Sequence, residues 1–241
     1  MLALFAAIAA TVTWVAFPAT LYEAPTRPAI HQATAPPAFS VALAHAETAG
    51  SPSISKAAPS AAATTAVPSV PFFSQFADIA SPTWQKVGCG ITDLTMIIDY
   101  YHPDAVSVET MLKKGIAAGA YDYNAGWIYQ GLIDLSKLYG LDGAYYDLTA
   151  LNAEAAYAAL AQHVEAGPVI ASVHYKFDPK NTIPHLVVIN GIKDDIVYYN
   201  DPAAREGAKS ISKSNFLKAW KKRIIDFRPS TQSRGVALDS H

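Results

Sequence analysis

Cys89 is the only cysteine of the 241-residue chain, and it lies between Gly88 and Gly90 at the start of an apolar run with helical spacing. A single cysteine excludes an intramolecular disulfide and a cysteine-cluster metal site. The glycines allow a tight turn and the close approach of a substrate, and a helix that begins here directs free N–H groups and its positive dipole end at the sulfur. These features favour a reactive thiolate, and the alternative interpretation is a small buried hydrophobe.

A thiol nucleophile needs a base, and the chain has seven histidines. Those in the N-terminal region, at the chain end or near helix ends are poorly placed to meet the thiol: His31, His45, His102, His163 and His241. Two remain, His174 near the end of a predicted strand and His185 at the start of the next strand. We favour His185, because it follows the turn sequence NTIP at the rim of a sheet, where a side chain can reach a facing helix.

Asp201 is the predicted partner of His185. It ends the neighbouring strand of a predicted hairpin, so its carboxylate can meet the imidazole across the strands. There it would fix the tautomer and stabilise the imidazolium. Asn200 is the alternative, but strand alternation directs it to the opposite face.

The elements that must position these residues come in two groups. Helical patterns come first: one begins at Cys89, one is capped by Ser107 and stopped by Gly119, one is capped by Asn124 and ended by Gly140, and one closes on Gly167. Strand-like runs follow at 168–175, 185–192 and 195–201, then a short helix from Ser214 and an edge strand at 224–227. Helices followed by an antiparallel sheet, without βαβ alternation, predict an α+β fold.

Composition predicts an apolar segment at 1–22, a disordered tether rich in Ala, Pro, Ser and Thr at 23–68, a globular domain at 69–229 and a flexible tail at 230–241. The apolar segment has roughly the twenty residues that span a bilayer, and it also suits the core of a secretory signal, although the usual basic flank is missing. Both interpretations predict an extracytoplasmic domain, either secreted or anchored to the membrane.

The net charge of −2 and the lack of a basic stripe argue against binding to a nucleic-acid backbone. We therefore expect recognition to depend on shape and site chemistry rather than on a bulk electrostatic field.

A series of motifs carries a family resemblance: VPFFSQ (70–75), GCGITDLTMIIDYY (88–101), GPVIASVHY (167–175), HLVVINGI (185–192) and VYYNDPA (197–203). In this order and spacing they resemble the papain-like cysteine peptidases of the bacteriocin-processing (double-glycine leader peptidase) type. The resemblance is closer to the stand-alone, exported C39-like relatives that lack a transporter, and it covers essentially all of 69–229.

This resemblance implies a papain-like fold in which Cys89 is the nucleophile, His185 the general base and Asp201 the orienting acid. It also implies that Gln75 donates a hydrogen bond to the oxyanion, together with the Cys89 backbone N–H. Gln85 is the alternative donor, and the VPFFSQ motif favours Gln75.

The chain departs from the family pattern at two positions. Pro184 precedes His185 where relatives usually carry glycine, which would stiffen or narrow the site. Asp93 stands where a small hydroxyl residue is common, one helical turn from the thiol, and we expect its side chain to face away.

The predicted function is that of an exported thiol-dependent hydrolase that cleaves a peptide (amide) bond. It needs no metal or organic cofactor, and its predicted partner is a peptide or protein substrate. The alternatives are a cell-wall amidohydrolase that acts on peptidoglycan, a transferase that uses the same acyl-enzyme, and a non-catalytic peptide-binding module. In such a module the aromatic segment YDYNAGWIYQ (121–130) would line a peptide groove.

Overall fold

The computed structural model describes residues 67–231. The predicted segment at 1–22, nearly all of the tether and the tail from 232 onward lie outside the described residues. Within 67–231, no helix has the length and apolar character needed to cross a membrane.

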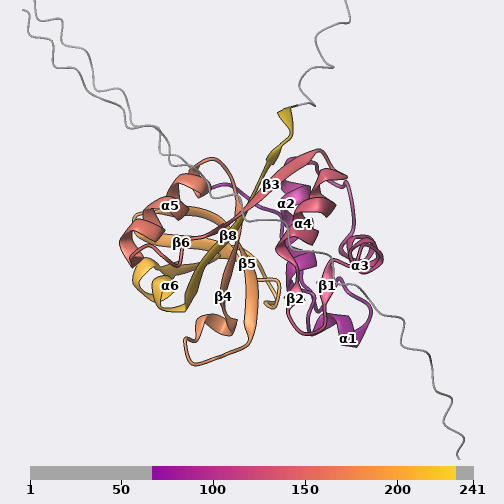
Figure 1. Cartoon of the computed structure of the whole chain (residues 1–241), viewed down its shortest axis with the longest axis horizontal. Helices are drawn as coiled ribbons and strands as arrows, with labels where there is room; N and C mark the ends of the chain where they lie inside the picture. The colour runs from indigo at the N-terminus through magenta and orange to yellow at the C-terminus, as the bar shows by residue number, and fades with distance from the viewer. Residues whose placement is uncertain (1–66, 232–241) are drawn as a thin grey trace, which may run out of the picture. The chain divides into compact units, whose positions relative to one another are not determined.

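The described chain contains helices and strands in the order shown in Figure 1. The helices are α1 (Pro82–Gln85), α2 (Cys89–Tyr101), α3 (Val108–Ala117), α4 (Tyr129–Lys137), α5 (Ala153–Glu165), the 3-10 helix η1 (Tyr175–Phe177) and α6 (Lys213–Ala219). The strands are β1 (Tyr121–Asp122), β2 (Gly126–Trp127), β3 (Leu141–Asp147), β4 (Val169–His174), β5 (Pro184–Lys193), β6 (Ile196–Asn200), β7 (Lys209–Ser212) and β8 (Trp220–Pro229).

A six-stranded antiparallel sheet with the order β3-β8-β4-β5-β6-β7 separates two groups of helices. Side chains that alternate along a strand point to opposite faces. On β5, Leu186 and Val188 therefore pack with the core around α2, α3 and α4, whereas Val187 and Ile189 pack with α5 and α6. Figure 1 shows the two groups on either side of the sheet, and this arrangement confirms the predicted α+β class.

Helix α2 is the central element of the first core. Every residue from Gly90 to Ile98 is buried, and α2 packs against α3, α4 and β5. Helix α3 begins after Ser107, the cap that the sequence predicts, and α5 begins after a further side-chain cap at Asn152. The Ser107 hydroxyl accepts a hydrogen bond from Thr110 N at 3.3 Å, and the Asn152 side chain accepts one from Ala155 N at 2.9 Å.

The predicted Asn124 cap is wrong. Helix α4 begins only at Tyr129, after an N-cap at Ile128, and Asn124 lies in the turn of the β1–β2 hairpin. In that turn the Asp122 carboxylate accepts a hydrogen bond from Asn124 N at 2.7 Å, and Gly126 adopts a φ of +86°. The turn therefore uses the residues that would otherwise start a helix.

The strand predicted at 224–227 is present as part of β8, but its predicted position at the edge of the sheet is wrong, because β8 pairs with β3 on one side and β4 on the other. The edges are β3 and β7, neither of which the sequence pattern predicts. Helix α6 begins at Lys213 with Ser212 as its N-cap, close to the predicted start at Ser214. The three other predicted strands correspond to β4, β5 and β6.

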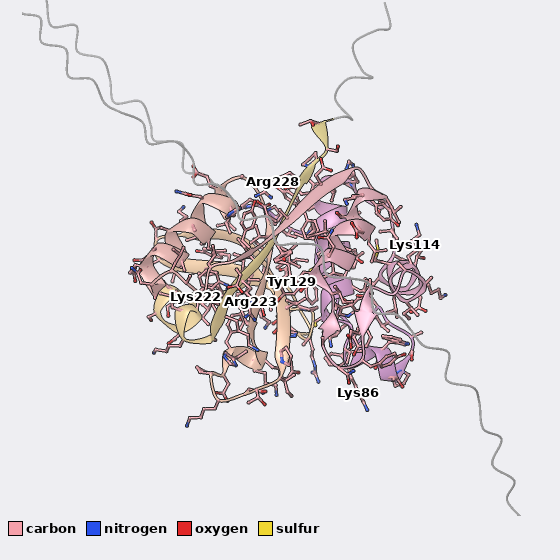
Figure 2. The ribbon with its side chains drawn as sticks, viewed as in Figure 1. Lys86, Lys114, Tyr129, Lys222, Arg223 and Arg228 are labelled. Atoms are coloured by element: carbon pink, nitrogen blue, oxygen red, sulfur yellow. The ribbon has the colours of Figure 1, made fainter. Side chains whose placement is uncertain are left out.

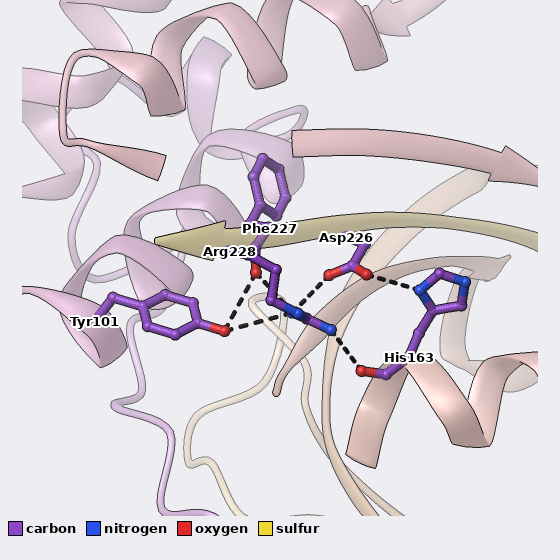
Figure 3. Close-up of polar contacts among 5 residues, drawn as sticks. All are labelled: Tyr101, His163, Asp226, Phe227 and Arg228. Carbon is purple, nitrogen blue, oxygen red and sulfur yellow. Dashed lines mark hydrogen bonds and ion pairs between the residues drawn. The ribbon is translucent and has the colours of Figure 1, made fainter. Parts of the chain in front are cut away.

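A polar network joins the C-terminal ends of α2 and α5 to β8 (Figure 3). His163 Nδ1 lies 2.7 Å from one oxygen of Asp226, and Arg228 forms an ion pair with the other oxygen at 2.5 Å. Arg228 also donates to the His163 carbonyl at 2.5 Å, and the Tyr101 hydroxyl donates to the Phe227 carbonyl at 3.2 Å. These contacts connect helices from both faces of the sheet.

Candidate active site

Cys89 is the first residue of α2, and Gly88 is its N-cap. Gly88 has an ordinary φ of −75°, so left-handed backbone geometry does not explain the flanking glycines. Close packing explains Gly90, because a Cβ atom there would lie 2.9 Å from the Trp127 side chain. Trp127 in turn donates a hydrogen bond from Nε1 to the Val87 carbonyl at 2.7 Å. The tryptophan on β2 thus holds the turn that carries Cys89.

The Cys89 sulfur contacts donors from two elements. The His185 side chain hydrogen-bonds to it, as do the backbone N–H groups of Leu186 on β5 and Gly90 on α2. Burial raises the pKa of Cys89, but the hydrogen bond and positive charge of His185 and the two backbone donors outweigh that effect. The net pKa of Cys89 is therefore lowered, which favours the thiolate.

His185 lies between Cys89 and Asp201 and is only 4% exposed. Its Nε2 atom lies 2.7 Å from Asp201 Oδ1, so Nδ1 is the ring nitrogen left for the sulfur. The Tyr175 ring meets the imidazole edge-on, with the ring centroids 5.1 Å apart. Burial lowers the pKa of His185, but the contacts with Asp201 and Cys89 prevail and raise it to about 10.

The carboxylate of Asp201 is fixed from two sides. Besides facing His185, Oδ1 accepts a hydrogen bond from Ala203 N at 2.9 Å. Burial raises the pKa of Asp201, but the hydrogen bond and charge of His185 outweigh burial, and the net pKa is lowered. The structure thus brings together the predicted nucleophile, base and acid.

The alternatives to this set of residues have other partners. His174 Nδ1 lies 2.7 Å from the Asn181 carbonyl in the loop after β4. The Asn200 side chain donates to the Val70 carbonyl and accepts from Asn190, each at 3.1 Å. Asn200 therefore faces away from His185, as strand alternation predicts.

Gln75 and Gln85 both lie beside the Cys89 turn but differ in their contacts. Gln75 is 3% exposed, and its Nε2 donates to the Gln85 carbonyl at 2.6 Å, which leaves a second amide N–H. The Gln85 side chain instead donates to the Phe76 and Ile79 carbonyls at 3.2 and 2.8 Å. Gln85 thus holds the loop, and Gln75 retains a donor.

The expectation that Asp93 faces away from the thiol is wrong. Asp93 is fully buried, and neither of its carboxyl oxygens has a hydrogen-bond partner among the described residues. Burial and the negative charges of Cys89 and Asp201 raise its pKa well above the ordinary value, and the positive charge of His185 opposes this rise. The physical reason is that α2 is enclosed on all sides and has no solvent-facing position for residue 93.

The aromatic segment at 121–130 forms a wall near Cys89. The rings of Trp84 and Tyr121 lie 5.1 Å apart and those of Tyr121 and Trp127 lie 5.2 Å apart. Burial and the charge of Cys89 both raise the pKa of Tyr121. Tyr123, at the hairpin turn, is 85% exposed. The sequence indicated the aromatic composition of this segment, but not that a hairpin carries it.

The sequence of residues 67–224 matches the model of the Peptidase_C39 like family. The chain therefore belongs to this family, and the resemblance inferred from the motifs is confirmed. A comparison with curated proteins finds no match.

Three solved structures are similar to this chain. A double glycine motif protease from an AMS/PCAT transporter, in complex with the leader peptide, is 22% identical with a TM-score of 0.48 and covers 69% of this chain and 96% of its own. A C39-like peptidase from Bacillus anthracis is 20% identical with a TM-score of 0.48, and the match covers 66% of this chain and 94% of that peptidase. The peptidase domain of Streptococcus ComA, a bi-functional ABC transporter, is 17% identical with a TM-score of 0.46, and the match covers 60% of this chain and 93% of that domain. Membership of the family rests on the sequence match alone.

Proposed function

We propose that this chain is a cysteine peptidase in which Cys89 attacks the carbonyl carbon of a peptide bond. The observation that carries the proposal is the position of His185, which lies between the Asp201 carboxylate and a sulfur at the start of a helix. Family membership supports an activity on peptides, either cleavage or binding. A lowered thiol pKa beside a raised imidazole pKa favours cleavage, because these are the properties of a thiolate–imidazolium pair.

The proposed reaction begins with the proton already on His185. The thiolate forms a bond to the carbonyl carbon, and the imidazolium donates its proton to the departing amine as the C–N bond breaks. A water molecule, deprotonated by the now neutral His185, then cleaves the thioester. Asp201 keeps the ring oriented throughout and stabilises its charged form.

Gln75 is the proposed side-chain donor to the oxyanion. One amide N–H is fixed on the Gln85 carbonyl, so the second N–H is held in a defined direction. The Cys89 backbone N–H is the proposed second donor, because the first N–H groups of a helix have no acceptor within the helix. Each such donor typically lowers the barrier by about 3 kcal/mol.

Peptide cleavage is tested by incubating the full-length protein with a peptide library, casein and purified cell wall, beside the Cys89→Ala variant. Release of peptides that requires Cys89 supports the proposal. Cleavage of cell-wall stem peptides alone would favour the amidohydrolase, and transfer to an added amine would favour the transferase. Binding without turnover in both proteins would favour the non-catalytic module.

We also propose that the protein acts outside the cytoplasm, as a secreted or membrane-anchored domain. The support is the uncharged apolar sequence at 1–22 followed by the Ala- and Pro-rich sequence at 23–68. Cell fractionation of the full-length protein and of a variant lacking 1–22 tests this, and equal cytoplasmic recovery of both would contradict it.

A further inference from the structure

A pocket of about 350 Å³ opens beside the candidate active site. Its lining comes from the helical half and from the sheet: Ala125, Tyr129, Tyr145, Asp147, Ser172, Pro184, Lys221 and Arg223. Figure 2 labels Tyr129 and Arg223 of this lining.

The sheet wall of the pocket continues into the Cys89 site. Pro184 immediately precedes His185 on β5. Ser172 on β4 is paired with Leu186, whose backbone N–H contacts the Cys89 sulfur. A peptide bound with its scissile carbonyl at Cys89 would therefore pass close to this pocket.

Positive charge predominates in the pocket lining. Arg223 is paired with Asp147 through an Nε–Oδ2 contact of 3.0 Å, but both side chains are almost half exposed, so this pair contributes little and can rearrange. Lys221 is half-buried beside Arg223, and no carboxylate of residues 67–231 pairs with it. One carboxylate thus faces two cations, and the pocket has an unbalanced positive charge.

The uncharged part of the pocket lining can contact the aliphatic part of a ligand side chain. The Tyr129 and Tyr145 rings meet edge-to-face with their centroids 6.1 Å apart, and Tyr145 is 56% exposed. Tyrosine rings offer apolar surface and a hydroxyl donor at the same site. A side chain with methylene groups and a terminal carboxylate would contact the rings and reach the cations.

We propose that this pocket is a specificity subsite that binds an acidic side chain, glutamate or aspartate, of the peptide substrate. The proposal rests on the proposed peptidase function and adds a substrate preference to it. Lys221 and Arg223 are its specificity-determining residues, with Arg223 exchanging Asp147 for the substrate carboxylate.

The electrostatics of Lys221 agree with this assignment. Burial and the neighbouring charge of Arg223 lower the pKa of Lys221. A bound carboxylate would counter both effects, because an opposite charge close by favours the protonated ammonium. Binding of an anionic ligand would therefore stabilise the protonated form of Lys221.

The test uses affinity labels that react with Cys89 without turnover. Bromoacetyl peptides carry a single glutamate one, two or three residues from the reactive group, and each is paired with its glutamine counterpart. The thiolate displaces bromide, and mass spectrometry follows the rate at which the adduct forms on the full-length protein. We expect the glutamate probe to react about fivefold faster than its glutamine counterpart at one spacing, since a partly desolvated ion pair has a stabilisation of about 1 kcal/mol.

Lys221→Met should abolish this charge preference while the glutamine probe keeps its rate. Lys222→Met is the matched control, because the Lys222 ammonium donates to the Leu151 carbonyl at 2.7 Å and does not line the pocket. It should retain the preference. A preference that is absent at every spacing, or unchanged in Lys221→Met, would overturn the subsite.

A second measurement separates this proposal from the peptidase function. N-acetyl-glutamate amide is titrated into the Cys89→Ala variant, and NMR follows the Lys221 side-chain signals. Binding that exceeds that of N-acetyl-glutamine amide and needs Lys221 supports the pocket even if Cys89 is unreactive. Equal binding of the two compounds would contradict the pocket even if Cys89 is reactive.

Discussion

The Asp93 carboxyl is enclosed one helical turn along α2 from the Cys89 sulfur. Its raised pKa favours the protonated form, which carries no charge to oppose the thiolate. An ionised Asp93 would instead place a negative charge beside Cys89 and Asp201 inside the core. The protonated carboxyl is therefore the form that the neighbouring thiolate favours.

Asp93→Asn should change how stability depends on pH. Because the pKa of Asp93 is raised in the folded state, its contribution to stability is complete below the unfolded pKa of about 3.9 and is lost as the pH rises through the folded value. The amide side chain of the variant cannot ionise, so the variant should gain stability relative to the wild type as the pH increases. Urea unfolding between about pH 4 and about pH 8 measures this difference. If the stability of the variant and of the wild type changed with pH in parallel, a raised pKa of Asp93 would be contradicted.

Asp201→Asn should lower the pKa of His185 below its value of about 10. Asparagine keeps a hydrogen-bond acceptor but removes the negative charge that helps to hold the proton on the ring. NMR titration of the His185 ring protons measures the change. Asp226→Asn is the matched control, since it alters the carboxylate beside His163 instead and should leave the His185 titration unchanged.

Gln75→Ala should slow turnover of a cleaved peptide by about 10²- to 10³-fold, the effect of removing one oxyanion donor. The rate of Cys89 alkylation by iodoacetamide should stay close to that of the wild type, because alkylation forms no oxyanion. Gln85→Ala should act differently: it frees the Phe76 and Ile79 carbonyls and should lower thermal stability. An equal loss of turnover and alkylation in Gln75→Ala would indicate a structural role instead.

Arg228→Met should lower the free energy of unfolding by about 2 kcal/mol, because it leaves the largely buried Asp226 carboxylate without its cation. The comparison is Lys137→Met, which removes an exposed ion pair with Asp134 and should change the free energy by less than about 0.5 kcal/mol. Chemical denaturation measures both. Equal effects would show that the network of Figure 3 does not stabilise the fold.

Local signals in the sequence predicted most of the helices and the contact between His185 and Asp201. The side-chain cap at Ser107 depends on a residue three positions away, so the sequence pattern predicted the start of α3. His185 and Asp201 are adjacent in a hairpin, which makes their contact predictable from strand alternation.

Features that depend on distant partners could not be predicted in the same way. The sequence pattern of β8 predicts an edge strand, but β3, which comes much earlier in the chain, pairs with the outer side of β8 and is itself the edge. The β1–β2 hairpin forms where Trp127 packs on Gly90, a contact that the local pattern of 121–130 does not encode. The burial of Asp93 could not be predicted either, because it depends on the sheet and the helices that enclose α2.

The most direct test of the thiolate–imidazolium pair is the pH dependence of Cys89 alkylation by iodoacetamide in the full-length protein and in His185→Ala. A thiol paired with an imidazolium reacts rapidly near about pH 5, whereas an ordinary thiol titrates near about pH 8.5. We predict rapid alkylation of the wild type at the lower pH and its loss in His185→Ala. Alkylation of the wild type that rises only near the ordinary thiol value would contradict the proposed peptidase mechanism.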